Sequence, residues 1–420
     1  MTNGINPTTK GQPALLLLES GAYIMGVSCG APGEAFGEIC FNTSMLGYPE
    51  IVSDPANAGL IVCLTYPQIG NYGLAYADLE SSQATLRGLV VRDMIETPSN
   101  YRSDISLPDY LAAQGIVAIT GVDTRALTRY LRERGAMRAV ITTLEDDPAA
   151  LLPRLKAAAG LSDQNLVSEV SCQAPYLYKA NEDESELFGP VAEPRYKVIA
   201  LDLGLARSTL NDLTRLGCAV IVVPWDTPAK ELLSYRPHGV LLAGGPGDPQ
   251  VPSACLRTAA ELMGKLPMLG IGLGHQVMAL AVGGTVEKLK NGHHGTSHPV
   301  TNMLGDSVTF PWQSHNFTVR FDSLGTMFGD IRESAIAANP SCGRIQLTEM
   351  DLNDESVEGL RYLDIPALSV QYHPQLTPGQ TEAAEPHRGF LEMMDKYQEE
   401  LASLSNISDL INNLSEAENA

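Results

Sequence analysis

The stretch Met268-Leu-Gly-Ile-Gly-Leu-Gly-His-Gln-Val-Met-Ala-Leu280 reads as a strand, a glycine turn and a helix. An apolar run enters a Gly-x-Gly-x-Gly turn, and a helical pattern leaves it. Turns of this shape serve in some enzymes as elbows that present a nucleophilic side chain at the apex. The apex here, Gly272, has no side chain. The stretch therefore predicts the backbone of a catalytic turn without its reactive atom.

The surroundings of this stretch predict a parallel α/β sheet. Apolar runs at 198–201, 219–223 and 239–242 alternate with helical patterns such as 208–216. Strands that are buried on both faces and separated by crossover helices are typical of parallel sheets. Ligands of such sheets bind beyond the carboxyl ends of the strands, where glycine-rich turns follow two of these runs. Neither turn has the spacing of a phosphate loop or a dinucleotide fingerprint, so nucleotide binding is not favoured.

A length of 420 residues predicts two domains. Before the parallel pattern, β-rich runs mix with helical stretches, one of which, 123–132, has Asp123 as a plausible N-cap. A polar acidic stretch at 179–186 then interrupts the periodicity. We expect a first domain over 13–172, a linker over 173–194, a second domain over 195–397 and an extension over 398–420.

The extension carries an apolar stripe at helical spacing, formed by Leu401, Leu404, Ile407, Ile411 and Leu414. We expect a short helix packed on its own domain, and a partner-binding helix is the alternative.

Composition excludes several classes of function. With 49 acidic and 28 basic residues, the chain has a net charge of -21, which repels nucleic acid and anionic membranes. No apolar stretch approaches the ~20 residues of a membrane span, so we expect a cytoplasmic protein. The seven cysteines are scattered and contain no CxxC pair, which favours neither a disulfide framework nor a zinc site.

Histidines supply the remaining candidates for chemistry. The segment 369–375 delivers His373 just past an apolar strand, where a general base could meet a turn like that at 272. A structural, hydrogen-bonding histidine is the plainer interpretation. His293, His294 and His298 are metal ligands by type, but no Cys or carboxylate accompanies them in the motif. We therefore expect no metal.

From about residue 13 to about residue 397, the sequence resembles the small, glutamine-amidotransferase subunits of carbamoyl-phosphate synthase. The motifs that carry the resemblance lie at 37–50, 65–73 and 121–129 in the first domain, and at 244–249, 273–276, 292–299 and 371–374 in the second. The resemblance implies an N-terminal small-subunit α/β domain and a C-terminal flavodoxin-like class I glutamine amidotransferase domain with a parallel sheet. It also implies glutamine cleavage by a Cys-His-Glu triad, and transfer of ammonia to a large subunit. ATP and magnesium are expected on that large subunit, and no cofactor is expected in this chain.

The sequence departs from the family pattern around the glutamine pocket. Gly272 stands at the cysteine position and Gln375 at the glutamate position, while His373 is retained. Ala243-Gly244 replaces a Ser-Asn pair, and Ser314 and Asn316 replace Asn and Gly. Six positions still match family residues that contact glutamine, namely Ser44, Gly245, Gly247, Leu273, Gln276 and Phe317. Cys255 and Cys342 are the nearest other thiols in sequence, but neither lies in an elbow.

Loss of a covalent nucleophile costs on the order of 10⁶ in turnover, because triad members act as a unit. We therefore predict a small subunit that does not hydrolyse glutamine and that supports ammonia-dependent carbamoyl phosphate synthesis by its large partner. One alternative is a regulatory or scaffold protein that binds glutamine without cleaving it. An ordinary glutamine-hydrolysing subunit is another. Service in arginine or in pyrimidine synthesis fits the resemblance equally.

Overall fold

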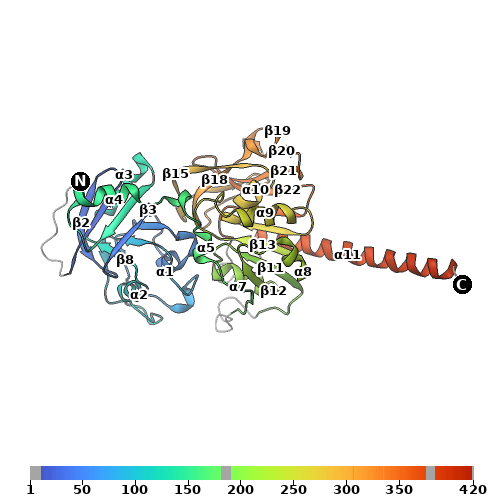
Figure 1. The fold of residues 1–420 in the computed structure, drawn as a ribbon, viewed down its shortest axis with the longest axis horizontal. Coiled ribbons are helices and arrows are strands. Elements are labelled where there is room, and N and C mark those ends of the chain that lie inside the picture. Colours follow the sequence, from blue (N-terminus) through green and yellow to red (C-terminus); the bar gives the residue numbers. More distant parts are fainter. Residues whose placement is uncertain (1–10, 181–190, 306, 334, 375–383, 419–420) are drawn as a thin grey trace.

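The computed structural model describes residues 11–180, 191–305, 307–333, 335–374 and 384–418, with side chains described up to 403. Figure 1 shows two α/β bodies side by side: the N-terminal one in blue to cyan, and the C-terminal one in green to orange. The last helix, in red, leads away from the second body. Single-turn 3-10 helices lie at Pro55–Asn57, Tyr76–Asp78, Leu161–Asp163, Phe321–Ser323 and Ile331–Glu333.

The first body is built on a closed barrel of strands in the order β1-β2-β8-β6-β4-β3-β9. The barrel closes because β9 pairs antiparallel with both β1 and β3. Its strands are β1 (Pro13–Leu18), β2 (Tyr23–Ser28), β3 (Glu34–Asn42), β4 (Leu60–Leu64), β6 (Gly88–Val90), β8 (Val117–Thr120) and β9 (Met137–Thr142). A separate two-stranded sheet joins β5 (Gln68–Ile69) to β7 (Asp93–Met94).

In the first body, the side chains of Ser106, Asp123 and Asp147 each cap the start of a helix. The helices of this body are α1 (Tyr48–Ser53), α2 (Leu107–Ala113), α3 (Thr124–Arg134), α4 (Pro148–Ala157) and α5 (Val167–Val170). The predicted cap of α3 is confirmed, since the Asp123 carboxylate accepts a hydrogen bond from the Ala126 N–H at 2.9 Å. Leu127 and Leu131, on the apolar face of α3, pack in the barrel core.

The second body contains the predicted parallel sheet. Its parallel strands are β11 (Tyr196–Asp202), β12 (Cys218–Pro224), β13 (Gly239–Ala243), β14 (Met268–Ile271) and β23 (Ala367–Val370). They run in the spatial order β12-β11-β13-β14-β23. In chain order this is 2-1-3-4-5, the order of flavodoxin-like sheets. The expected α/β class and flavodoxin-like sheet are therefore confirmed.

Helices cover both faces of this sheet, because alternate residues of each strand point to opposite sides. Ile199 and Leu201 of β11 pack with α8 (Ala229–Ser234), α9 (Ser253–Leu262) and α10 (Leu273–Ala281). Val198 and Ala200 pack on the other side with α7 (Arg207–Arg215) and α11 (Glu385–Glu418). The strands therefore lie in a three-layer sandwich with both faces buried.

Antiparallel strands extend the parallel sheet beyond β23. They are β22 (Val357–Tyr362), β21 (Gly343–Asp351), β20 (Ile336–Asn339), β19 (Thr326–Phe328), β16 (Val300–Asn302) and β17 (Val308–Thr309). A separate pair, β15 (Thr285–Gly295) and β18 (Gln313–Arg320), carries two segments of the family resemblance, and β15 lies against β3 of the barrel. The two bodies thus meet at this pair.

The segment predicted as a linker, 173–194, begins with a strand. β10 (Tyr176–Leu177) pairs antiparallel with β12 at the edge of the second sheet. The Tyr178 N–H also donates to the Val220 carbonyl at 2.9 Å. The chain therefore joins the second body before it reaches the acidic stretch, part of which, 181–190, lies outside the described residues.

The C-terminal extension is part of a single 34-residue helix, α11. Phe390 and Met394 are fully buried against the sheet, whereas Leu401 is exposed. Beyond these anchors the helix leads away from the body (Figure 1). The expected helix is present but it is not short, because it continues the helix that begins at Glu385, and no Gly or Pro interrupts residues 390–418. The side chains of the predicted stripe after Leu401 lie outside those that the structure describes. Within the described part of the chain, no helix is both long and apolar enough to cross a membrane.

Candidate functional site

The stretch that opened the sequence forms the predicted elbow between β14 and α10. Gly272 adopts φ 60° and ψ −119°, a conformation that side-chain-bearing residues adopt only under strain. A Cβ at Gly270 would lie 2.6 Å from Met278 Sδ, and one at Gly274 only 1.9 Å from the Leu242 carbonyl oxygen. At Gly272 the nearest atoms, on Gly244 and Gln371, would be 3.9 Å away. Of these three glycines, only the apex has room for a side chain.

Neighbouring parallel strands bring the predicted site residues to the same edge. Gly245 and Gly247 follow β13, Gly272 follows β14, and His373 follows β23. The Gly272 N–H donates to the Val370 carbonyl at 3.0 Å, which ties the elbow to the strand that carries His373. The structure therefore brings His373 to the edge of the sheet that holds the elbow. The predicted orienting position, Gln375, lies outside the described residues.

The start of α10 supplies backbone donors beside the apex. Intrahelical bonds begin with the His275 N–H, which donates to the Gly272 carbonyl at 3.1 Å. The first N–H groups of a helix, here those of Leu273 and Gly274, fall outside the intrahelical pattern. Groups of this kind stabilise negative charge on a bound ligand. Leu273 also packs against Gly245, where a Cβ would lie 2.5 Å from Leu273 Cδ2.

Gln276 and Phe317, two predicted glutamine contacts, are joined to each other. The Gln276 side-chain amide donates to the Phe317 carbonyl at 2.7 Å and to the Gln371 side-chain oxygen at 2.9 Å. All three residues are buried. Ser44 is buried in the loop after β3, and its Oγ has no hydrogen-bond partner among the described residues. A side chain with an unused hydroxyl thus stands at the first-domain position that the resemblance predicts.

His373 faces carboxyl groups that the sequence did not point to. A cavity of about 100 Å³ is lined by His373 together with Gly47, Glu50, Asp54, Glu80, Ala206 and Trp312. Burial raises the pKa of Glu50 to about 7. It also raises the pKa of Glu80, whose carboxylate accepts the Ser208 N–H at 2.9 Å. These acids come from the first body, and no periodicity or spacing in the sequence pairs them with residue 373.

The altered positions around the elbow make contacts of their own. A Cβ on Gly244 would lie 2.0 Å from the Gly204 carbonyl oxygen, so no side chain fits there without a backbone shift. Ser314 Oγ donates to Asn57 Oδ1 of the first body at 3.1 Å. Asn316 Oδ1 lies 3.2 Å from His294 Nε2. The altered residues therefore make contacts of their own with their neighbours around the site.

Cys255 and Cys342, the nearest thiols in sequence, lie outside the elbow. Cys255 is fully buried within α9, and Cys342 lies in a buried turn after β20. Burial raises the pKa of the Cys255 thiol to about 12 and that of Cys342 to about 11. A thiol acts as a nucleophile through its thiolate, and burial disfavours that form at both residues.

The histidines at 293–298 lie next to carboxylates, contrary to the expectation from the sequence. Asp351 Oδ2 is 3.5 Å from His298 Nδ1, and Glu358 Oε1 is 3.6 Å from His293 Nδ1. The acids lie on β21 and β22, more than fifty residues after the histidine motif. The sequence argument compared only neighbours along the chain, so it missed partners supplied by the sheet.

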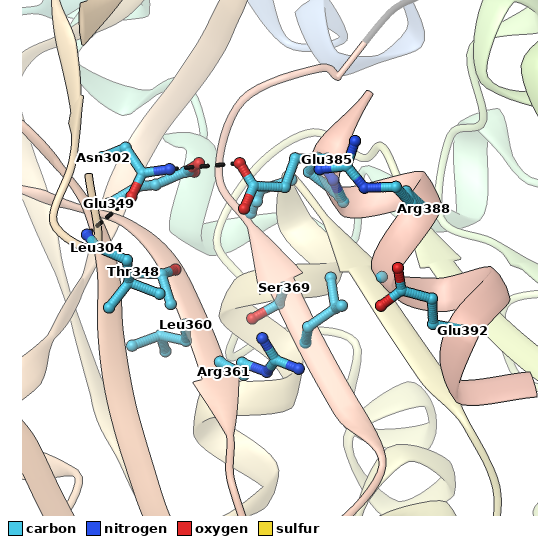
Figure 2. A pocket seen from close by; sticks show the side chains of 14 residues that line it. Asn302, Leu304, Thr348, Glu349, Leu360, Arg361, Ser369, Glu385, Arg388 and Glu392 are labelled. Carbon is cyan, nitrogen blue, oxygen red and sulfur yellow. Dashed lines mark hydrogen bonds between the residues drawn. The ribbon is translucent and has the colours of Figure 1, made fainter. Parts of the chain in front are cut away.

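A larger pocket of about 200 Å³ lies between the antiparallel strands and the start of α11. Figure 2 shows Asn302 and Glu349 facing Glu385 and Arg388, with Asn302 Nδ2 donating to Glu385 Oε2 at 3.3 Å. Burial raises the pKa of Glu349 to about 8. None of the predicted site residues lines this pocket.

Comparison with known proteins agrees with this architecture. The family model described as carbamoyl-phosphate synthase small chain, CPSase domain, matches residues 16–141. That of glutamine amidotransferase class-I matches residues 199–393. The solved structure of a GMP synthase component from Thermoplasma acidophilum covers 49% of this chain and 97% of its own with 22% identity. Its TM-score of 0.38 is too low to establish a shared fold.

Full-length relatives are much more similar. The carbamoyl phosphate synthase small chain of Syntrophotalea carbinolica is 41% identical over 385 residues, covering 91% of this chain and 98% of its own. Those of Thermosynechococcus vestitus and of a Synechocystis species are 42% and 41% identical, covering 92% and 94% of this chain and 98% and 100% of their own. This chain belongs to the family of carbamoyl-phosphate synthase small chains and carries a class-I glutamine amidotransferase domain.

Proposed function

We propose that this chain is a carbamoyl-phosphate synthase small subunit that binds a large subunit but does not hydrolyse glutamine. The large subunit would hold ATP and magnesium and would use free ammonia. The observation that carries the proposal is the apex of the elbow. Gly272 keeps the strained backbone of a nucleophile turn and 3.9 Å of clearance for a side chain, but it supplies no sulfur.

The chemistry of the remaining groups supports the loss of hydrolysis. Amidotransferase cleavage requires a covalent bond from the enzyme to the amide carbon of glutamine. Burial raises the pKa of all seven cysteines, so no thiolate is available near neutral pH. Without a nucleophile, His373 has no proton to accept. The expected loss in turnover is on the order of 10⁶ relative to a family member with an intact triad.

Partner binding is the function that the intact parts of the molecule favour. The barrel motifs at 37–50 and 65–73 carry no altered position of the kind found around the elbow. Glu38 in the first motif forms a salt bridge with Lys288 of β15, across the junction of the two bodies. The barrel motifs are unaltered while the positions around the elbow are altered. A subunit that binds a partner in a cytoplasmic assembly accounts for this difference better than a free-standing hydrolase does.

Glutamine binding without cleavage is a second candidate, and Ser44 favours it. Its buried Oγ has no partner within the described part of the chain, and a buried hydroxyl without a partner is costly. A ligand amide or carboxylate at this position would supply the missing hydrogen bond. Such a protein could sense glutamine, and binding to the isolated chain can be measured by calorimetry.

Co-expression with a candidate large subunit tests the proposal. The assembled enzyme should form carbamoyl phosphate from ammonium and should form none above background from glutamine. A small chain that keeps the Cys-His-Glu triad, with its own large subunit, serves as the glutamine-using control. Failure to co-purify would favour the regulatory protein. Glutamine-dependent synthesis at the control rate would overturn the proposal and establish an ordinary hydrolysing subunit.

A further inference from the structure

A buried cluster of histidines and carboxylates lies beside the elbow domain's junction with the barrel. His293 comes from β15, His315 from β18, Asp351 from the end of β21 and Glu358 from β22. His298 reaches the same point from the loop before β16. The side chains of Asp351 and Glu358 are 0% exposed, and those of His293 and His315 are 5% exposed. Elements distant in sequence therefore converge on a largely buried site.

The separations between the inward-facing atoms fit ligands of a shared ion. Glu358 Oε1 lies 3.6 Å from His293 Nδ1 and 3.9 Å from His315 Nε2. Asp351 Oδ2 lies 3.5 Å from His298 Nδ1 and 3.9 Å from His293 Nδ1. Ligand atoms about 2.0–2.2 Å from a tetrahedral Zn²⁺ are roughly 3.3–3.6 Å from one another. The measured values match this spacing or exceed it by a few tenths of an ångström.

Most of these atoms have no other partner. His293 Nδ1, His298 Nδ1, His315 Nε2 and Asp351 Oδ2 make no hydrogen bond within the described residues. Buried polar atoms are nearly always satisfied, so four unsatisfied atoms aimed at one point indicate a missing partner. A cation is a partner that accepts ring-nitrogen lone pairs and carboxylate oxygens together.

Hydrogen bonds on the far side of the ligands orient them inward. His293 Nε2 lies 2.9 Å from Asp354 Oδ2, and His315 Nδ1 lies 2.8 Å from the Phe317 carbonyl oxygen. Each oxygen accepts a hydrogen bond from a ring N–H, which leaves the opposite nitrogen with its lone pair directed into the cluster. Glu358 is held in the same way, since Gln313 Nε2 donates to its Oε2 at 2.8 Å. Ligands of protein metal sites are oriented by contacts of this type.

We propose that this chain binds one divalent transition-metal ion, of the Zn²⁺ class, among His293, His298, His315, Asp351 and Glu358. His293 belongs to both candidate triads, His293–His315–Glu358 and His293–His298–Asp351, so it anchors the ion. Three imidazoles with carboxylates suit Zn²⁺ better than Mg²⁺ or Ca²⁺, which prefer oxygen ligands.

The ion would be structural and would fix the junction of the two bodies. Ser297, in the same loop as His298, shares a hydrogen bond of 2.6 Å with Thr43 of the first body. Gly295 lies against Ser44, whose Oγ would be 2.7 Å from an added Cβ. Holding β15, β18 and this loop together would place Ser44 and Phe317 relative to the elbow. The proposal does not depend on whether glutamine is hydrolysed.

Metal uptake by the untagged full-length chain tests the inference. The chain is stripped with dipicolinate, dialysed, incubated with Zn²⁺ and assayed by mass spectrometry for bound metal. We expect about one ion per chain, and Tm should rise by roughly 5–10 °C at a hundredfold excess of free Zn²⁺ over Kd. Co²⁺ should give the visible d–d absorption of a nitrogen and oxygen site. If the folded wild-type chain binds neither Zn²⁺ nor Co²⁺, the proposal is overturned. That result is expected if a protonated His293, rather than a metal ion, balances the charge of the carboxylates.

Two variants and a matched control locate the ion. Asp351→Asn and His298→Asn should each abolish stoichiometric Zn²⁺ binding and the Co²⁺ spectrum. Glu349→Gln, on the same strand but bonded to the Tyr372 hydroxyl outside the cluster, should bind like wild type. Because the His298 side chain is 19% exposed, its replacement is expected to fold even where Asp351→Asn does not. Unchanged binding in His298→Asn, or equal loss in Glu349→Gln, would refute this assignment.

Discussion

Introducing sulfur at the elbow by Gly272→Cys is the sharpest test of the proposed loss of glutamine hydrolysis. A Cβ at residue 272 would have its nearest neighbours 3.9 Å away, which is ordinary van der Waals contact. The variant should therefore fold. The backbone at φ 60° costs a side-chain-bearing residue ~1–3 kcal/mol, and at about 2–4 °C per kcal/mol the Tm should fall by roughly 2–12 °C.

The same variant should gain little glutaminase activity. The new thiol would lie at the start of α10, where the helix dipole lowers the pKa of cysteine. Gly244, Ser314 and Asn316 would remain, and Gly244 has no space for a side chain. Loss of an orienting carboxylate alone costs ~10⁴ in serine proteases. We expect turnover of glutamine below about 10⁻³ of that of an intact relative, measured as glutamate released.

Two controls separate strain from chemistry in this experiment. Gly272→Ala imposes the same backbone cost without sulfur and should match the Tm of Gly272→Cys. Gly283→Ala places a side chain at φ 90° with no atom within 4 Å, and so reports the cost of a left-handed backbone alone. Glutamine turnover by Gly272→Cys within about tenfold of an intact relative would refute the view that the surrounding pocket has also changed.

Further predictions concern the triad, the buried histidines and the last helix. Adding Gln375→Glu to Gly272→Cys should raise glutaminase activity more than either change alone, and equal activity of the double and single variants would contradict a role for residue 375. Burial lowers the pKa of His387 to about 4. Because the folded state then binds fewer protons than the unfolded one below pH 6.5, His387 costs stability as pH falls. Replacement by Leu should therefore gain ~2 kcal/mol over wild type between pH 7 and pH 5 in urea titrations. Phe390→Ala should cost ~3–5 kcal/mol by the same method, since its ring is fully buried against Gly239. Removing residues 404–420 should leave Tm within about 1 °C of wild type if α11 is anchored only by its first turns, and a larger drop would show that its end packs on the protein.

The fold was predictable where burial leaves a local pattern. Apolar runs identified β11, β12 and β13 because strands buried on both faces have no polar alternation. The elbow was predictable because glycines at 270, 272 and 274 mark a turn in which helix and strand approach closely. The length of α11 was not predictable, since apolar spacing does not show where a helix leaves its domain.

Parts of the site built across the sheet were not predictable from local sequence. The carboxylate of Asp351 reaches the histidine motif through the pairing of β16 with β21, and that of Glu358 through the contact of β22 with β18. The acids around His373 come from the other body, through Glu50 and Glu80. Spacing along the chain carries no information on such contacts, because they depend on which strands become neighbours.

The altered residues support the proposal that the pocket departs from the family pattern at more positions than the apex. At the apex, the space for a side chain is still present, because a Cβ on Gly272 would have its nearest neighbours 3.9 Å away. The carbonyl of Gly204 instead occupies the space that a side chain on Gly244 would need. Ser314 binds Asn57 of the barrel, and Asn316 contacts His294 beside the histidine cluster. The first contact joins the two bodies and the second links β15 to β18. Substituting Ser314 or Asn316 with the family residues would therefore remove these packing contacts. On the proposed function, a single substitution at Gly272 would therefore not make this subunit an active amidotransferase.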